Sequence, residues 1–265
     1  MRCPPSPWQA LGLSLLLLLG ACATRPDPSD REAVAEYEQN NDPLEPTNRV
    51  SYEVHDAIDR AVLEPAARGY RAVVPGPVRT GIGNALANLR SPVTLLNDLL
   101  QGEGDRARIT LGRLMVNTVL GLGGVFDLSR TWGVPGHTED FGQTLAVWGV
   151  GEGPYLFIPL LGPSNPRDLA GTGVDFAADP VGYFGQGTIV DALNWTRVGL
   201  TVLDTREGLI ETVDGLRQGS LDPYATIRSG YRQRRSAQIR NRDADAGAEG
   251  GPSGLGRGFG FQPRP

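Results

Sequence analysis

Glycine and proline are spread along the whole of this 265-residue chain, with 36 glycines and 21 prolines. Both residues interrupt regular helices, glycine through its backbone freedom and proline through its missing N–H. Because they are distributed rather than concentrated in one block, we expect many short helices with frequent breaks. About 200 residues lie between the polar N-terminal linker and the polar C-terminal tail, and this length is enough to form one sizeable hydrophobic core.

The N-terminus has the layout of a secretory signal peptide. Arg2 precedes a nearly unbroken apolar run from Leu11 to Leu19, and two small residues then lead into Cys22. The run is about half of the 20 or so apolar residues that a membrane-spanning helix needs. The cysteine at the cut resembles a bacterial lipoprotein lipobox, which implies cleavage before Cys22 and its acylation. An ordinary signal peptide with a chance cysteine is the alternative.

Composition excludes several classes of site. Cys3 leaves with the signal peptide, so the mature chain has no internal disulfide and no cysteine-rich metal site. His55 and His137 are the only histidines, and we expect no metal and no cofactor. All 25 basic residues are arginine, which excludes mechanisms that need a phosphate-loop or Schiff-base lysine. A net charge of −5 argues against nucleic acid as a partner.

Composition shifts divide the chain into four parts. Residues 1–21 are the expected signal peptide, and residues 22–41, polar with two prolines, are a lipidated tether. Residues 42–235 are the expected helical body. Residues 236–265 nearly lack aliphatic side chains, which predicts a disordered tail.

Helical periodicity recurs inside the body, whereas the alternation typical of strands is rare. Apolar residues at spacings of three and four predict helices over residues 45–63, 93–101, 106–120, 188–216 and 222–235. Ser91 and Pro92 are interpreted as the N-cap and first position of the second helix. The sequence therefore indicates an all-α fold.

Two apolar segments do not fit an ordinary soluble bundle. Residues 114–126 contain no charge, and residues 153–163 are apolar but interrupted by Pro154 and Pro159. Neither can cross a bilayer as a continuous helix. Two interpretations remain open, which are buried core and a surface that lies in the membrane interface or lines a lipid path.

Five segments occur in a characteristic order. They are NDPLEPTNR at 41–49, NLRSPVTLLNDLLQG at 88–102, GRLMVNTVLGLGGVFD at 112–127, EDFGQTLAVWGVGEGPYLFIPLLGPSNPRD at 139–168 and DPY at 222–224. Together with the lipobox, they resemble the MlaA (VacJ) family of outer-membrane phospholipid-transport lipoproteins. The chain departs from that family at Thr47, Val54 and Ala85, where an aromatic residue is usual, and at His55, where asparagine is usual.

The resemblance implies a single ring-like body of short helices, with no transmembrane span in the mature chain, on the periplasmic face of the outer membrane. It implies an amphipathic channel that takes misplaced phospholipids from the outer leaflet. It also implies contact with a porin trimer and hand-off to a soluble periplasmic lipid carrier. Ala23, rather than aspartate, follows Cys22, which is similar to the signal for outer-membrane sorting.

We name lipidation at Cys22 and eight further candidates for a lipid path or gate. These are Asn48, Arg49, Gly121, Gly123, Gly124, Tyr155, Phe157 and Arg167. Each has a structural alternative, such as a tight turn for the glycines or pairing with Asp168 for Arg167. An arginine facing a lipid phosphate is the functional interpretation of Arg167.

No catalytic residues are assigned, and we expect no enzyme. His137 lies near acidic residues, but no GxSxG serine exists to serve it. Two other functions remain as alternatives to lipid transport. One is a structural envelope lipoprotein associated with porins, and the other is a periplasmic lipid hydrolase.

Overall fold

The computed structural model describes residues 27, 29–30, 42–182 and 188–240. The predicted signal peptide, Cys22 and most of the tether and tail lie outside the described residues. The described part is mostly helical, which confirms the all-α prediction. Its helices are α3 (Glu45–Ile58), α4 (Glu64–Val73), α5 (Gly76–Leu100), α6 (Gly104–Val119), α7 (Leu128–Thr131), α8 (Phe141–Val147), α9 (Pro166–Ala178), α10 (Thr188–Gly208), α11 (Ile210–Gly219) and α12 (Pro223–Ile239).

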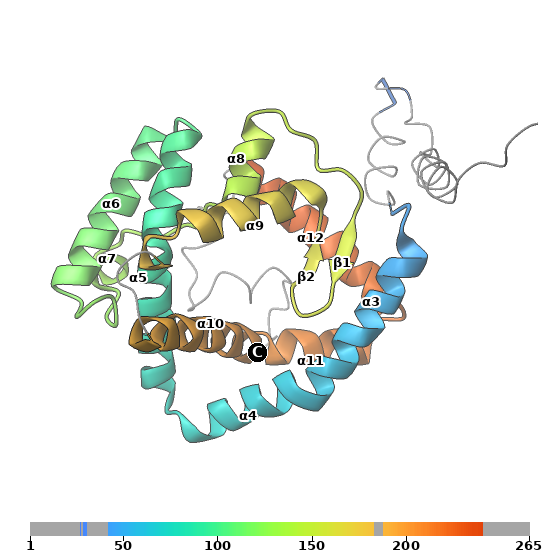
Figure 1. Ribbon diagram of the computed structural model, residues 1–265, viewed down its shortest axis with the longest axis horizontal. Coiled ribbons are helices and arrows are strands. Elements are labelled where there is room, and N and C mark those ends of the chain that lie inside the picture. The colour runs from blue at the N-terminus through green and yellow to red at the C-terminus, as the bar shows by residue number, and fades with distance from the viewer. Residues whose placement is uncertain (1–26, 28, 31–41, 183–187, 241–265) are drawn as a thin grey trace, which may run out of the picture.

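The helices follow one another around a perimeter (Figure 1). α3 and α4 form one side, α5 and α6 form the opposite side, and α8, α9 and α12 complete the ring. α10 and α11 run across the ring beside α4, against which α10 packs. None of the helices in the described ranges combines the length and apolarity that a bilayer crossing needs.

The N-terminal side of the ring is one long helical segment. α3 continues through a π-helical turn, η1 (Asp59–Leu63), directly into α4. Proline stands in the first turn of both α-helices. At the free start of α3 its missing N–H costs nothing, whereas Pro65 of α4 follows η1 directly and withholds an N–H from continuous helical backbone. The prediction of a helix over 45–63 is therefore correct but ten residues too short.

The predicted start of the second helix is wrong. α5 begins at Gly76 and runs through Pro92, which lies inside the helix rather than at its first position. Its earlier part is held by α6 and the turn that follows α6, where Asn88 Nδ2 donates to Thr118 Oγ1 at 2.9 Å. Tertiary packing thus maintains a helix through a residue that normally ends one.

The long helix predicted over 188–216 is two helices, α10 and α11, which meet at Leu209 after Gly208. Three shorter helices were not predicted, although each has an acidic or amide N-cap. The caps are Asp127 for α7, Asp140 for α8 and Asn165 for α9. α12 ends at Ile239, so its last turn lies within the tail predicted to begin at residue 236.

One short β-hairpin interrupts the helices, between α8 and α9. β1 (Leu156–Ile158) pairs antiparallel with β2 (Gly162–Ser164), with Phe157 opposite Pro163. The hairpin lies between α3 and α12, which both contact it (Figure 1). Phe157 of β1 and Tyr155, which directly precedes β1, pack with Tyr224 of α12 as an aromatic core.

Candidate functional site

Burial in this protein is inverted relative to an ordinary soluble domain. Among the described residues, only 8 hydrophobic residues are buried, whereas 21 buried residues are polar or charged and 32 large hydrophobic residues are exposed. Soluble proteins bury aliphatic side chains first and seldom expose a large contiguous apolar patch. The described body therefore has apolar surfaces whose exposure to water is unfavourable, and its interior is stabilised by polar contacts.

One such surface surrounds the end of α6 and the turn after it, and we call it the α6 apolar surface. Each of its side chains is more than half exposed. They are Met115, Val119, Leu120, Leu122, Phe126 and Trp132. The predicted apolar segment 114–126 thus lies largely on the surface, which favours the membrane-interface interpretation over buried core for this segment.

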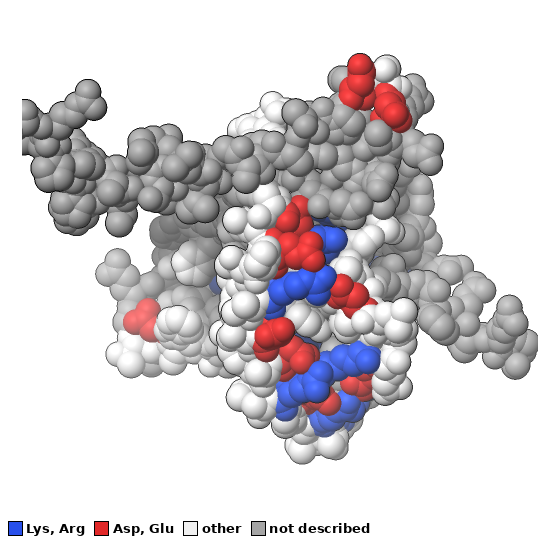
Figure 2. Space-filling model, turned by 90° about the vertical axis from the view of Figure 1, so that its right-hand side faces the viewer, with Lys and Arg blue, Asp and Glu red and all other residues white. Residues whose placement is uncertain are grey.

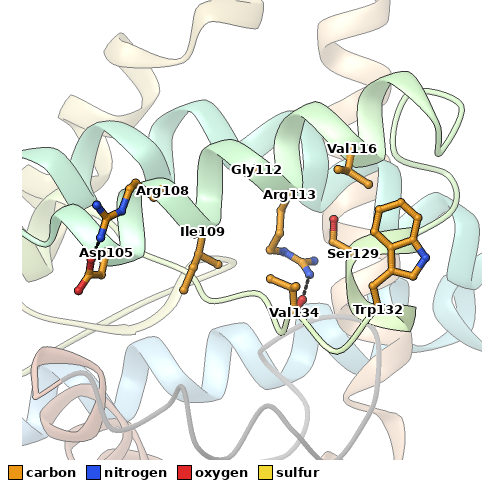
Figure 3. A pocket seen from close by; sticks show the side chains of 9 residues that line it. All are labelled: Asp105, Arg108, Ile109, Gly112, Arg113, Val116, Ser129, Trp132 and Val134. Atoms are coloured by element: carbon orange, nitrogen blue, oxygen red, sulfur yellow. Dashed lines mark hydrogen bonds and ion pairs between the residues drawn. The ribbon is translucent and has the colours of Figure 1, made fainter.

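A groove of about 470 Å³ opens on the same side, between α6 and residues 129–134. Figure 3 shows Ile109, Val116 and the Trp132 ring along the groove, with Arg108 and Asp105 paired at one end. Arg113 of α6 donates a hydrogen bond to the Val134 carbonyl (Figure 3). Its Nη2 also donates to Asp127 Oδ2 at 2.7 Å. The charges beside this mainly apolar groove are therefore engaged with each other.

The three candidate glycines lie in the turn that ends α6. Gly123 and Gly124 have φ of 71° and 95°, in the left-handed region that favours glycine. A Cβ on Gly121 would lie 2.2 Å from the Phe126 carbonyl oxygen, so only glycine fits. These glycines therefore shape the turn that presents the α6 apolar surface.

Tyr155 and Phe157 are almost completely buried, at 1% and 4% exposure, so neither presents its side chain to a lipid path. Their rings meet Tyr52 and Tyr224 edge to face, with the Tyr52 and Phe157 centroids 5.5 Å apart. Edge-to-face aromatic pairs add stability beyond the area they bury. The apolar segment 153–163 is thus partly core, in contrast to segment 114–126.

Asn48 joins α3 to this core. Its Nδ2 donates to Asp42 Oδ1 at 2.8 Å and to the Tyr155 carbonyl at 2.9 Å, while its Oδ1 accepts from the Phe157 N–H at 2.9 Å. The side chain is 3% exposed. Asn48 therefore fixes the position of the β1–β2 hairpin against α3 through hydrogen bonds.

Replacing Asn48 by alanine should lower the free energy of unfolding by about 2 kcal/mol, because the buried Phe157 N–H loses its acceptor. Asn84→Ala is the matched control, since Asn84 Nδ2 makes one exposed bond of 3.2 Å to the Val125 carbonyl. That control should change stability by less than about 0.5 kcal/mol. Urea unfolding of both variants in mild detergent measures the difference, and equal effects would contradict this role of Asn48.

A row of arginine–carboxylate pairs, which we call the arginine seam, joins the N-terminal helices to α10, α11 and α12. Arginine suits this task because its fork binds a carboxylate through two bonds. Figure 2, which faces the side that carries α3, shows positive and negative side chains interspersed. The pairs are Arg228–Asp42, Arg49–Asp222, Arg217–Asp56, Arg217–Asp59, Arg206–Asp59, Arg68–Asp214, Arg71–Glu207 and Arg71–Glu211.

Asp59 is a buried acid of the arginine seam, at 3% exposure. Arg206 donates to both of its oxygens, at 2.6 and 2.8 Å, and Arg217 adds a bond of 2.8 Å. Burial raises the pKa of Asp59, but the bonds and charges of the two arginines outweigh burial and hold that pKa below 3.8. Arg49, a candidate lipid contact, belongs to the same seam through Asp222 and Glu45.

Arg167 is also engaged within the protein. Its Nε donates to Asp168 Oδ1 at 3.0 Å, and its side chain is 6% exposed. Asp168 further accepts from Tyr231, and Arg235 bridges Asp168 and Asp140. The structure thus places Arg167 in a buried polar cluster and gives it the pairing alternative foreseen from the sequence.

A second buried cluster contains Asp98, His137 and Glu139, which are close enough together to suggest a metal site. Every carboxylate oxygen already has a donor. Asp98 accepts from His137 Nε2 and from Thr110, and Glu139 accepts from Arg106 and Gln101. The Arg106 guanidinium lies beside both acids, where it supplies the positive charge that a metal ion would otherwise supply.

The same cluster does not form a hydrolytic relay. In such a relay, one imidazole nitrogen faces the acid and the other faces the nucleophile. Here Asp98 and the Thr110 hydroxyl both contact His137 Nε2, at 2.9 and 3.2 Å. His137 therefore does not connect an acid to a hydroxyl nucleophile.

Sequence reasoning missed the polar interior, including Asn97, Asp98, Gln143 and Thr144, all at most 1% exposed. Asn97 bonds to Asp175 and to Thr144, which lie 78 and 47 residues away, so these contacts leave no local pattern in the sequence.

Comparison with known proteins identifies relatives over most of the chain. A family model described as "MlaA lipoprotein" matches residues 40–238. An intermembrane phospholipid transport system lipoprotein MlaA from Haemophilus influenzae is 36% identical over 228 residues, 83% of this chain and 85% of that protein. The Escherichia coli K12 protein of the same name is 33% identical over 234 residues, 85% of each chain.

A solved structure agrees with the fold. It is described as "Structural basis for maintenance of bacterial outer membrane lipid asymmetry", and it matches with a TM-score of 0.63 and 32% identity. The match covers 75% of this chain and 98% of that one.

Proposed function

The chain belongs to the MlaA lipoprotein family, and from this premise we propose that it removes misplaced phospholipids from the outer leaflet of the outer membrane. In this proposal, the lipids pass through an amphipathic channel in the ring and reach a soluble periplasmic carrier. The protein is anchored through acylated Cys22 to the periplasmic face of the outer membrane and contacts a porin trimer. It moves intact lipids and catalyses no reaction.

The inverted burial is the observation that carries this proposal. A phospholipid has a charged head and apolar chains, so a protein that handles it needs apolar surface beside polar surface. The 32 exposed large hydrophobic side chains supply the first, and the arginine seam supplies a rigid polar frame. An anchored body gains from exposed apolar side chains that a freely soluble protein would have to hide.

The names of the relatives support the same direction. The Haemophilus influenzae and Escherichia coli proteins are named as components of an intermembrane phospholipid transport system. The related solved structure concerns outer-membrane lipid asymmetry. These names mention neither a porin nor a carrier, and contact with a porin trimer and transfer of lipid to a soluble carrier are part of our proposal.

Deleting the gene should increase outer-leaflet phospholipid and detergent sensitivity, and the wild-type gene should restore both. Cys22→Ala should fail to restore them, because the protein loses its acyl anchor. Outer-leaflet phospholipid is measured by lipid A acylation or by phospholipase accessibility in intact cells. A deletion that leaves the leaflet composition unchanged contradicts the proposal, and copurified porin without lipid would favour a structural brace.

A double substitution tests the α6 apolar surface. Val119→Glu combined with Leu122→Glu introduces two charges at residues that are both 70% exposed, so the protein should still fold. The charged surface should no longer bind the membrane, and the variant should fail to complement the deletion. Leu221→Glu is the control, because Leu221 is fully exposed but lies beside the polar arginine seam at Asp222. Complementation by the double variant at wild-type level would show that this surface does not touch lipid.

A further inference from the structure

The turn of the β1–β2 hairpin is held in an unfavourable backbone conformation. Leu160, at its centre, has φ of 67°, in the left-handed region that leucine rarely adopts. Leu160 and Leu161 are both more than half exposed, so burial of their side chains does not fix this turn. A hydrogen bond from a neighbouring element offsets part of the cost of this conformation.

That contact comes from His55 on α3. The Leu160 N–H donates to His55 Nδ1 at 3.1 Å, across 105 residues of sequence. The imidazole is oriented by Phe157 of β1, whose ring it meets edge to face with centroids 5.5 Å apart. Because Nδ1 is an acceptor only when it carries no proton, this bond exists only with neutral histidine.

We propose that His55 is a proton-sensitive latch, which holds the hairpin turn against α3 near neutral pH and releases it in acid. Protonated imidazole has a donor on both nitrogens, so the Leu160 N–H would then face another N–H. The bond would be replaced by repulsion, and the turn would be free to leave its left-handed conformation. The latch goes beyond the proposed lipid transport and does not require it.

The surroundings of His55 support neutrality at pH 7. Burial is the largest influence and lowers the pKa of His55 below 6.5. The charged groups that face it are Asp56 and Asp59 from its own segment, Arg206 from α10 and Arg217 from α11. The two arginines pair with the two aspartates, so their opposing effects on the imidazole largely offset each other.

The sign of the pH dependence follows from this lowered pKa. A histidine whose pKa is lower in the latched state disfavours that state once it is protonated. The latch is therefore fully formed above pH 6.5 and is lost as the pH falls through the lowered value.

Hydrogen–deuterium exchange of the mature lipidated protein in detergent micelles tests the latch at the Leu160 amide. After correction for intrinsic exchange, protection in the wild type should fall about fivefold between about pH 7.5 and about pH 4.5, well below the ordinary histidine value, which is the effect of losing one ordinary hydrogen bond. His55→Asn retains an acceptor oxygen that does not titrate in this range, so its protection should be independent of pH. His55→Leu should show low protection at both values.

Two outcomes would overturn the latch. One is wild-type protection that does not change with pH. The other is an equal fall in His55→Asn, which would assign the effect to another group. Because exchange at Leu160 is read without any lipid assay, failure of the latch and failure of the proposed lipid transport are separate results.

Discussion

Gly171→Ala is expected to lower the free energy of unfolding by about 3 kcal/mol, because α9 crosses α8 in direct backbone contact at this residue. A Cβ on Gly171 would lie 2.2 Å from the Gly142 nitrogen and 2.6 Å from the Gly142 Cα. Backbone atoms cannot move aside as a flexible side chain can. The two helices would have to separate, and the cluster of Asp140, Asp168 and Arg235 beside them would be disturbed.

Gly173→Ala is the matched control in the same helix. A Cβ there would meet nothing within 4 Å, so the substitution should stabilise the protein by about 0.5 kcal/mol through better helix propensity. Chemical unfolding followed by circular dichroism in mild detergent compares the two variants. The prediction requires effects of opposite sign, and two similar shifts would show that α8 and α9 do not cross as closely as described.

Asp59→Asn is expected to cost about 3 to 5 kcal/mol, the usual effect of removing one partner from a buried ion pair. The change keeps the shape of the side chain but leaves Arg206 and Arg217 facing a neutral amide. Arg206 is 7% exposed, so water cannot readily replace the lost charge. The substitution therefore weakens the contact of η1 with α10 and α11.

Asp105→Asn is the control for this substitution, because Asp105 and Arg108 form a pair that is exposed by 82% and 80%. Exposed pairs contribute at most about 1 kcal/mol, so this change should be nearly neutral. The pH dependence gives a second test. Since the pKa of Asp59 is lowered, its contribution is present above 3.8 and is lost as the pH falls below that value. A wild-type protein equally stable on both sides of this value would contradict the seam.

Local sequence signals predicted part of the fold well. The apolar spacing before Leu63 and the Asp222–Pro223 pair identified α3 and α12, since caps and helical faces are properties of neighbouring residues. The same local reasoning placed a helix start at Pro92, which α5 and α6 override by packing. It also joined α10 and α11 into one predicted helix, because one glycine inside an apolar stripe is a weak signal of a helix end.

The candidate site was predicted less well than the fold. Tyr155 and Phe157 are core residues, and Arg49 and Arg167 pair with carboxylates of the protein itself. An apolar or charged residue has the same appearance in a sequence whether it faces lipid, water or another helix. The decisive partners, such as Asp222 for Arg49, lie 173 residues away.

The sequence by itself determined a mostly helical body and membership of a lipoprotein family, because these depend on local spacing and ordered motifs. Only the tertiary structure decided which apolar residues are exposed and which charges are buried. The reason is that burial is set by contacts between distant segments. The arginine seam, the Gly142–Gly171 crossing and the His55–Leu160 contact all join segments that only the folded ring brings together.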